Sequence, residues 1–305
     1  MEKWHRSVLL DETVSSLGEI RGGRFADLTF GEGGHTEELL NRGAAEVIAV
    51  DRDREAIDRY LKSGAMKDDK RLKLLHGNLS SFPDVPLDGP LDGILMDLGV
   101  STRQILESER GFSFTNPGPL DMRMNRDDGQ PLSELLRDIE EDELANIIYA
   151  NTDLKSSRRA ARQILFAFKK GELETTAQLA ELFKDRRPGP HYGSLAASTV
   201  IFLALRMWVN DEGGEVRDTV PRLIPLLKVG GRLAVITFHS SEDRWVKNIF
   251  QALAGKCVCF SQPCSCVRKE TVRWITKKPV APSDKELAEN PRSRSALLRC
   301  VERLE

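Results

Sequence analysis

The sequence predicts an α/β protein in which a mainly parallel sheet is interrupted by a helical insertion. Apolar strand patterns alternate with helical patterns over the first hundred residues, and the same rhythm returns in the last hundred. Between them, residues 103–193 carry helical patterns and no strand pattern. Apolar strands alternating with helices are typical of a parallel sheet covered on both faces. We therefore expect one α/β domain formed by residues 1–102 and 194–305, with an all-helical domain inserted over 103–193.

The predicted elements follow in order along the chain. Four strands are expected at 24–30, 45–53, 71–79 and 91–100, and a helix from about Thr36 follows the first. The insertion should hold helices over 131–149, 157–170 and 175–185. After the insertion, we expect a long helix over 194–208, followed by a helix, a glycine turn and a strand over 220–238. The fold ends with a helix over 245–253 and strands near 271–280 and 295–304.

Composition limits the class of protein. With 305 residues, 40% of them hydrophobic and 30% charged, the chain has ordinary globular composition, which excludes collagen-like, coiled-coil and wholly disordered proteins. A net charge of −2 argues against a protein that coats nucleic acid nonspecifically. The longest apolar run, Val200–Leu205, is far shorter than the roughly 20 residues of a membrane span, and no signal peptide is recognisable. We expect a cytoplasmic protein with no membrane partner.

The turn after the first strand is rich in glycine. Gly31, Gly33 and Gly34 would let the backbone approach a ligand at the carboxyl edge of the sheet, although they also suit ordinary tight turns. Asp51 ends the second strand, where a carboxylate binds the hydroxyls of a ribose. Thr36 replaces the third glycine of the dinucleotide fingerprint. The pattern therefore argues against a dehydrogenase and favours a cofactor without pyrophosphate, such as S-adenosylmethionine.

Asp97 ends the fourth strand, at the same edge of the sheet. A carboxylate in this place can accept a hydrogen bond from an amino group and lie near a sulfonium. The alternative is a cap on a helix or turn that follows, because Gly99 and Ser101 come directly after it.

Two basic groups and a cysteine group stand out. Arg158, Arg159 and Arg162 share a helix face in an acid-free segment, and Arg292 and Arg294 form a second group. Such groups can hold phosphates, as in RNA, or be solvated surface. Four cysteines form two Cys-x-Cys pairs separated by four residues: Cys257, Cys259, Cys264 and Cys266. Their thiolates could bind a structural zinc ion, or the four side chains could remain reduced thiols.

Seven stretches that span nearly the whole chain in order match one family. They are His5–Glu12, Thr29–His35, Asp92–Ser101, Glu109–Phe114, Pro119–Met124, Phe238–Arg244 and Asn290–Ser295. Several of them, such as Pro-Leu-Asp-Met-Arg-Met, are absent from methyltransferases in general. The sequence resembles the MraW (RsmH) family of bacterial 16S ribosomal RNA cytosine-N4 methyltransferases.

The resemblance implies a Rossmann-like class I S-adenosylmethionine-dependent methyltransferase domain with an inserted helical substrate-recognition domain. It implies N4-methylation of one cytidine in the decoding region of 16S rRNA, with the small ribosomal subunit as partner. Carried over position by position, the cofactor contacts fall on Gly33, Gly34, His35, Asp51, Leu79, Asp97 and Gln104. Whether the chain forms a homodimer is left open.

Departures from the family pattern keep alternatives open. Leu79 stands where the family often has Phe, and Ala196 and Val200 stand at a family His and Arg. We expect Asp97 to accept the proton of the cytosine amine, although a backbone carbonyl is an alternative acceptor and His239 a weaker candidate for the pocket. The alternative functions are a methyltransferase with a shifted substrate and a nonenzymatic RNA-binding or ribosome assembly factor.

Overall fold

The computed structural model describes residues 7–66, 68–184, 186–189, 192, 195–259, 264 and 268–305. The chain divides into two compact units, one formed by residues 1–99 and 214–305 and the other by residues 100–213. The first unit is an α/β unit and the second is helical. No helix in the described ranges is both long and apolar enough to cross a membrane.

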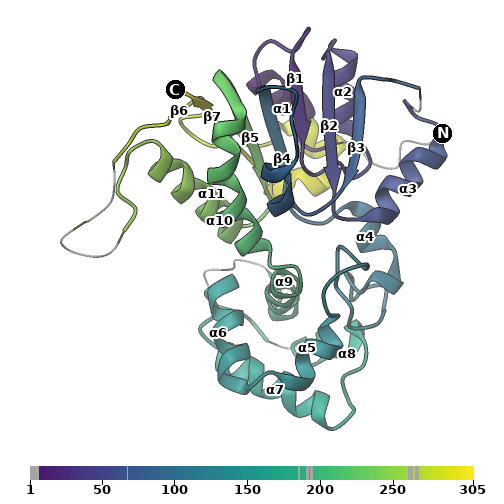
Figure 1. The fold of residues 1–305 in the computed structure, drawn as a ribbon. Coiled ribbons are helices and arrows are strands. Elements are labelled where there is room, and N and C mark those ends of the chain that lie inside the picture. The colour runs from purple at the N-terminus through teal and green to yellow at the C-terminus, as the bar shows by residue number, and fades with distance from the viewer. Residues whose placement is uncertain are drawn as a thin grey trace. The chain divides into compact units, whose positions relative to one another are not determined.

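The α/β unit is built on one seven-stranded sheet with the strand order β3-β2-β1-β4-β5-β7-β6 (Figure 1). Strands β1 to β5 are parallel, and β7 runs antiparallel to both β5 and β6. The strands are β1 (Arg24–Asp27), β2 (Glu46–Asp51), β3 (Leu72–His76), β4 (Leu91–Asp97), β5 (Leu227–Thr237), β6 (Val272–Trp274) and β7 (Leu297–Arg303). The predicted Rossmann-like α/β fold is confirmed.

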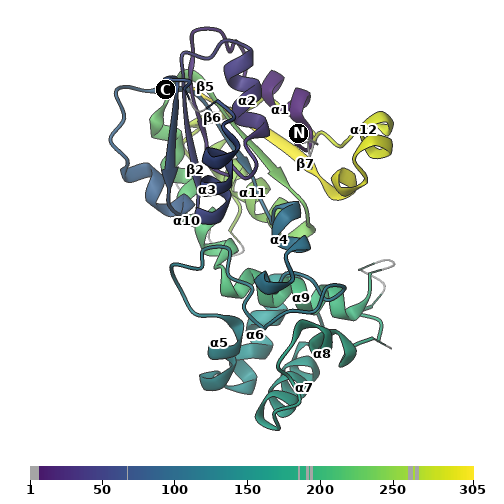
Figure 2. The same ribbon diagram turned by 90° about the vertical axis from the view of Figure 1, so that its right-hand side faces the viewer.

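Helices cover both faces of this sheet (Figure 2). Along β2, Val47 belongs to a core cluster with residues of α1 (Leu10–Ser16) and α2 (Gly34–Asn41), and Ala49 packs with Tyr60 of α3 (Arg54–Ser63). The alternate residues Ile48 and Val50 belong to the cluster of α10 (Glu212–Leu223) and α11 (Ser240–Leu253). A short helix, α12 (Asp284–Glu289), precedes β7. The near-continuous apolar character of β2 follows from this two-sided burial.

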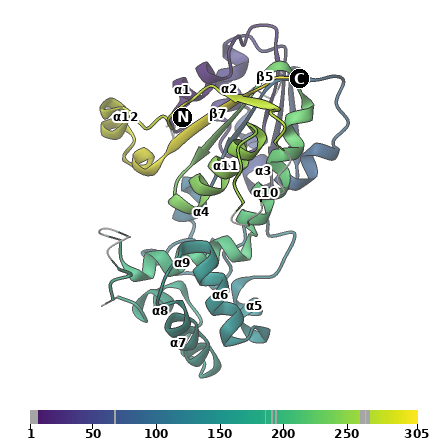
Figure 3. The ribbon, with the colours of Figure 1, turned by 90° about the vertical axis from the view of Figure 1, so that its left-hand side faces the viewer.

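Most helices of the helical unit pack around one apolar core (Figure 3). Its helices are α4 (Thr102–Leu106), α5 (Leu132–Asp138), α6 (Glu141–Thr152), α7 (Ser157–Lys169), α8 (Thr176–Glu181) and α9 (Ala197–Val209). The predicted helix over 131–149 is divided into α5 and α6. Its break lies at Ile139 and Glu140, which are both extended, and Ile139 is buried in the core of the unit.

The second predicted domain boundary differs from the structure. Residues 194–213 were assigned to the α/β domain, but the boundary between the units falls at 213/214, in the first turn of α10. Helix α9 is apolar on most of its surface, and its residues Val200, Ile201 and Leu205 pack with Ile148 of α6 in the core of the helical unit. A helix of this kind needs to be buried on all sides, and the other helices of the insertion provide that burial.

Candidate active site

Three aspartates end neighbouring strands at the carboxyl edge of the sheet. Asp27 ends β1, Asp51 ends β2 and Asp97 ends β4, and β1 lies between the other two. Chain connections leave the β1/β4 pair in opposite directions, so this pair is the topological switch point at which open α/β sheets bind ligands. The structure therefore brings the predicted Asp51 and Asp97 together on either side of Asp27.

Asp51 fixes the glycine turn. Gly31 N–H donates to Asp51 Oδ2 at 2.6 Å, and Asp53 N–H donates to Asp51 Oδ1 at 2.7 Å. Burial raises the pKa of Asp51 to about 6, although both backbone hydrogen bonds oppose the shift. Each carboxylate oxygen keeps a second acceptor position, so Asp51 can hold the turn and still accept from a ligand hydroxyl.

Asp27 was not among the predicted site residues. Its side chain is fully buried, Thr36 Oγ1 donates to its Oδ2 at 2.8 Å, and Thr29 N–H donates to its Oδ1 at 3.2 Å. Burial raises its pKa to about 6, with the negative charge of Asp51 adding to the shift. Thr36 thus fixes the first turn of α2 on β1. An aspartate at the last position of the strand before a glycine turn was the signal in the sequence.

Asp97 is the most perturbed of the three. Burial, and then the charges of Asp27 and Glu242, raise its pKa well above its usual range. Its Oδ2 lies 3.9 Å from His35 Nδ1, and within the described chain its buried Oδ1 has no hydrogen-bond partner. Ser101, not Asp97, caps the helix that follows. The cap interpretation of Asp97 is therefore wrong, and its inward oxygen is available to a ligand.

The glycines of the turn are required by the chain's own packing. Gly33 has φ +82°, and a Cβ on it would lie 2.6 Å from Tyr60 Cε2. A Cβ on Gly34 would collide with Ser7 Oγ of the N-terminal segment. The buried His35 places Nε2 3.2 Å from a carbonyl oxygen of the same segment. The space that side chains at positions 33 and 34 would take is therefore filled by Tyr60 and Ser7.

The other two predicted cofactor residues lie in different units. Leu79 begins a short 3₁₀ helix after β3 and is partly buried against the core of the α/β unit. The segment before it is tied to β2, because Gly77 N–H donates to Asp51 O at 2.9 Å. Gln104 belongs to the helical unit, where Ser101 N–H donates to its Oε1 at 2.9 Å in a capping box. Its predicted cofactor contact stays a prediction.

His239 has a different local role from the one expected. It caps α11, because its Nδ1 accepts from Glu242 N–H at 3.3 Å. The buried Glu242 accepts from Phe238 N–H at 2.8 Å. It also lies 3.0 Å from His239 Nε2. Sequence analysis missed Glu242 because an acidic residue in a first helical turn is common for dipole reasons alone.

The predicted RNA-binding arginines are exposed, but two of them have acidic partners. Arg158 Nη1 lies 2.5 Å from Asp142 and Arg162 Nε lies 3.0 Å from Glu141, both at the start of α6. Arg159 is exposed on the same helix. In the other unit, the exposed Arg292 and Arg294 lie in a 3₁₀ turn before β7. The sequence of α7 contains no acid, but its neighbour α6 supplies two.

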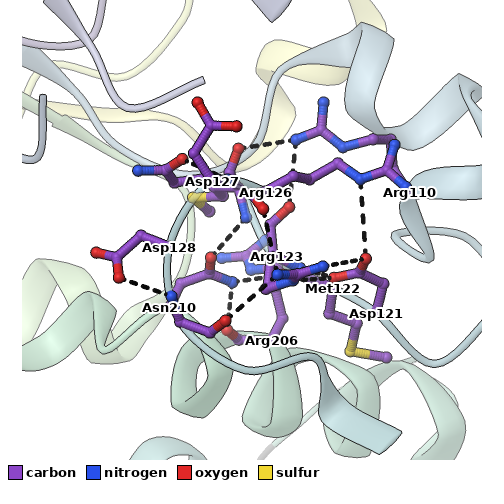
Figure 4. Close-up of polar contacts among 12 residues, drawn as sticks. Arg110, Asp121, Met122, Arg123, Arg126, Asp127, Asp128, Arg206 and Asn210 are labelled. Carbon is purple, nitrogen blue, oxygen red and sulfur yellow. Dashed lines mark hydrogen bonds and ion pairs between the residues drawn. The ribbon is translucent and has the colours of Figure 1, made fainter. Parts of the chain in front are cut away.

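The Pro-Leu-Asp-Met-Arg-Met segment is braced from inside the helical unit (Figure 4). Asn210, which caps α9, donates from Nδ2 to Met122 O at 2.7 Å and accepts at Oδ1 from Met124 N–H at 2.7 Å. The buried Arg110 donates to Met124 O at 2.8 Å. Met122 has φ +63°, an unfavourable conformation for this residue type. These contacts hold the segment in a shape it would not adopt alone.

Asp121 and Arg123 form an ion pair in this segment. Arg123 Nε and Nη2 donate to the two carboxylate oxygens of Asp121 at 2.7 and 3.1 Å (Figure 4). Arg126 Nε lies 3.8 Å from Asp121 Oδ2. Arg123 Nη1 also donates to Arg126 O and Gly129 O, each at 3.3 Å, and these bonds close the loop within the helical unit.

Three of the four clustered cysteines lie together. Cys257, Cys259 and Cys264 form one group of potential ligand atoms, and Cys266 lies outside the described residues.

The chain is similar to known proteins in its sequence and, more weakly, in its fold. The chain is 40% identical to a ribosomal RNA small subunit methyltransferase H of Syntrophotalea carbinolica and to one of Brevibacillus brevis, with 98% of both chains covered in each case. Among solved structures, an S-adenosylmethionine dependent methyltransferase from Mesorhizobium loti matches with a TM-score of 0.41 at 11% identity, covering 97% of this chain and 98% of that one. The model of the MraW methylase family matches residues 2–304. The chain belongs to the MraW methylase family.

Proposed function

We propose that this chain is an S-adenosylmethionine-dependent methyltransferase that acts on N4 of one cytidine in the decoding region of 16S rRNA. One observation carries the cofactor half of the proposal: Asp27, Asp51 and Asp97 meet at the switch point of the sheet, each with a raised pKa. Buried carboxyl groups of like charge favour a cationic ligand, because a cation lowers the free energy of their ionised forms. A sulfonium nucleoside supplies that charge and ribose hydroxyls together.

The residues present fit this cofactor. Asp51 keeps acceptor positions for ribose hydroxyls, and the buried Oδ1 of Asp97 faces no protein donor in the described chain. S-adenosylmethionine supplies an activated methyl group, so the protein's task is mainly to position the acceptor for in-line attack. We assign to Asp97 a hydrogen bond from the cytosine amine and removal of its proton, with a backbone carbonyl as the alternative acceptor.

The RNA half of the proposal rests on the relatives and on the helical unit. Curated relatives that match the full chain are named for methylation of small-subunit rRNA. The exposed Arg158, Arg159 and Arg162 lie on α7, whose own sequence has no acid, and they can contact phosphates, although Arg158 and Arg162 are paired with acids of α6. Arg292 and Arg294 offer a second contact in the other unit. We assign substrate recognition to the helical unit, and the target base must leave its stack to reach a methyl donor.

A shifted substrate is the second candidate. Val200, at the position of a family arginine, is buried in the core of the helical unit, so no charged group is presented there.

Nucleotide-resolved mass spectrometry of 16S rRNA from a strain lacking the gene, with and without complementation, tests the proposal. We expect one decoding-region cytidine to lose a methyl group on N4 and to regain it with the wild-type gene but not with an Asp97→Asn variant. A change at another nucleotide would establish the shifted substrate. Unchanged rRNA, together with no heat of S-adenosylmethionine binding in calorimetry, would leave the nonenzymatic assembly factor.

A further inference from the structure

Helix α7 carries an exposed aromatic ring that the proposed reaction does not use. The buried face of this helix, which includes Ala161, Ile164 and Leu165, packs in the core of the helical unit. Phe166 lies outside that core and is 59% exposed. A single exposed apolar side chain is common on protein surfaces, so the groups around the ring decide what it can bind.

Basic side chains lie along the same side of α7 as this ring. The exposed residues of that side follow one another at helical spacings of three or four and form what we call the α7 stripe: Arg159, Arg162, Phe166, Lys169 and Lys170. At about 1.5 Å per residue, Arg162 and Lys170 lie about 6 Å along the helix on either side of Phe166. The ring is therefore in the middle of a cationic stripe.

Lys170 contacts the ring directly. Its Nζ lies 4.4 Å from the centroid of the Phe166 ring, which is a cation–π contact. The contact restricts the orientation of the ring, while the exposure of Phe166 leaves ring surface open to solvent. A flat partner that stacks on this open surface would therefore cost the protein little conformational entropy.

The positive charge of the α7 stripe is only partly compensated. Arg162 forms an ion pair of 3.0 Å with Glu141 of α6, and this pair is open to solvent. Exposed ion pairs contribute little free energy and are screened by salt, so a phosphate group can replace Glu141. Among the residues that the structure describes, Arg159, Lys169 and Lys170 have no acidic partner. The stripe can therefore hold an anionic chain.

We propose that Phe166 stacks on an unpaired base of RNA while the basic side chains of the α7 stripe contact the phosphates on either side of that base. Unpaired bases offer their flat faces, whereas the bases of a duplex are covered by their neighbours. An acidic protein surface would match the charge of the stripe but would not alternate charges with flat rings. The inference rests on the proposed function for its choice of RNA, and it adds that the RNA is single-stranded where it crosses α7.

Binding of two RNAs to the purified full chain tests the proposal. The probes are a single strand of about 12 nucleotides and the duplex that it forms with its complement. We expect Phe166→Ala to weaken binding of the single strand about tenfold or more and binding of the duplex less than twofold, because only the single strand offers a free base. The dependence of affinity on salt should not change, since no charge is removed.

Tyr149→Ala is the matched control. Tyr149 is an aromatic residue of the same unit and is 52% exposed, but it lies on α6, whose first turn is acidic. Its replacement should leave the affinity for both RNAs unchanged. Because Phe166 and Tyr149 are both exposed, we expect both alanine variants to keep the melting temperature of the wild type.

Two further variants separate stacking from simple apolar contact. Phe166→Leu keeps an apolar side chain without a ring and should lose as much affinity as Phe166→Ala, whereas Phe166→Trp should bind the single strand at least as tightly as the wild type. The fluorescence of the added indole, measured as the difference from the wild type with its four tryptophans, should be quenched by the single strand and not by the duplex. Unchanged affinity in Phe166→Ala, equal losses with both RNAs, or wild-type affinity in Phe166→Leu would overturn the proposal.

These measurements do not depend on methyl transfer. If Phe166→Ala weakens binding of the single strand but the gene does not restore methylation of the cytidine, the stacking contact stands and the proposed function fails. If methylation is restored and Phe166→Ala binds the single strand as the wild type does, the proposed function stands and the stacking contact is wrong.

Discussion

At the scale of single residues, burial is the main influence on the carboxyl groups of the candidate site. The pKa of Asp27 and that of Asp51 are raised to about 6, from an ordinary value of 3.8. The folded chain therefore binds protons more tightly than the unfolded chain, and these groups contribute most to the free energy of unfolding below about pH 4. That contribution is lost as the pH rises through about 6, and each tenfold difference in proton affinity corresponds to about 1.4 kcal/mol.

The raised pKa values of these carboxyl groups lead to a first prediction, which concerns ligands. S-adenosylmethionine carries a positive charge at sulfur, and S-adenosylhomocysteine does not. S-adenosylmethionine should therefore stabilise the protein more against heat, and this advantage should grow as the carboxyl groups ionise. We expect the difference in melting temperature to be larger at about pH 7.5 than at about pH 5.5 in differential scanning fluorimetry. Asp88→Asn, which changes an exposed carboxylate, is the control that should leave the difference intact. A difference independent of pH would contradict the electrostatic argument.

Asp97→Asn provides a second prediction at this scale. The amide keeps the size of the side chain but cannot accept a proton, so methyl transfer should fall by about 100-fold or more. In single-turnover measurements the wild-type rate should rise with pH as the raised pKa of Asp97 is passed, and the rate of the variant should be independent of pH over that range. S-adenosylhomocysteine affinity, measured by calorimetry, reports whether the pocket is intact. A variant with the wild-type rate and pH profile would assign the proton to the backbone carbonyl.

At the scale of elements, the cap of α9 acts on a segment far away in the sequence. Asn210 makes two 2.7 Å hydrogen bonds to the backbone of Met122 and Met124, and both are buried. Asn210→Ala leaves one buried donor and one buried acceptor without partners. We expect a loss of about 2–4 kcal/mol in the free energy of unfolding, measured by denaturant titration. Asn146→Ala, at an exposed position of α6, should change it by less than about 0.5 kcal/mol.

The ion pairs between α6 and α7 predict that two substitutions change the affinity for RNA in opposite directions. Arg159→Ala should weaken RNA binding and lower its salt dependence by about one counterion, since one phosphate contact is lost. Glu141→Gln should strengthen binding, because it releases Arg162 from its 3.0 Å ion pair. Filter binding at several salt concentrations measures both effects. If Glu141→Gln leaves the affinity unchanged while Arg159→Ala lowers it, Arg159 contacts RNA and Arg162 does not.

At the scale of the whole molecule, the residues predicted to contact the cofactor are divided between the two units. Asp51 and Asp97 lie in the α/β unit, whereas Gln104 lies in the helical unit beside its capping partner Ser101. Hydrogen exchange with S-adenosylhomocysteine tests whether one ligand engages both. We expect protection of the 31–36 turn and also of α4, because ordering of Gln104 by the ligand would slow local opening there. Protection confined to the α/β unit would remove Gln104 from the cofactor site.

The sequence by itself determined the elements and much of the site. Strand and helix periodicity placed β1 to β4 and the helices α2, α7, α8 and α9 within a few residues, because the period of side-chain burial is a local property of the chain. It did not predict α1, α3, α4 or α12, and the expected glycine turn lies inside β5. Asp51 and Asp97 were predicted because residues that end parallel strands of one sheet share its carboxyl edge. The ordered motifs, matched over nearly the whole chain, gave the family that the comparison over residues 2–304 establishes.

Only the tertiary structure decided which partners those elements take. It assigned α9 to the helical core, put the buried Asp27 and Glu242 beside the predicted carboxylates, and gave Arg158 and Arg162 acidic partners on another helix. None of these follows from a local pattern. An apolar helix can satisfy its burial in either unit, and a charged side chain meets whichever groups long-range packing brings near, so both depend on contacts between segments far apart in the sequence.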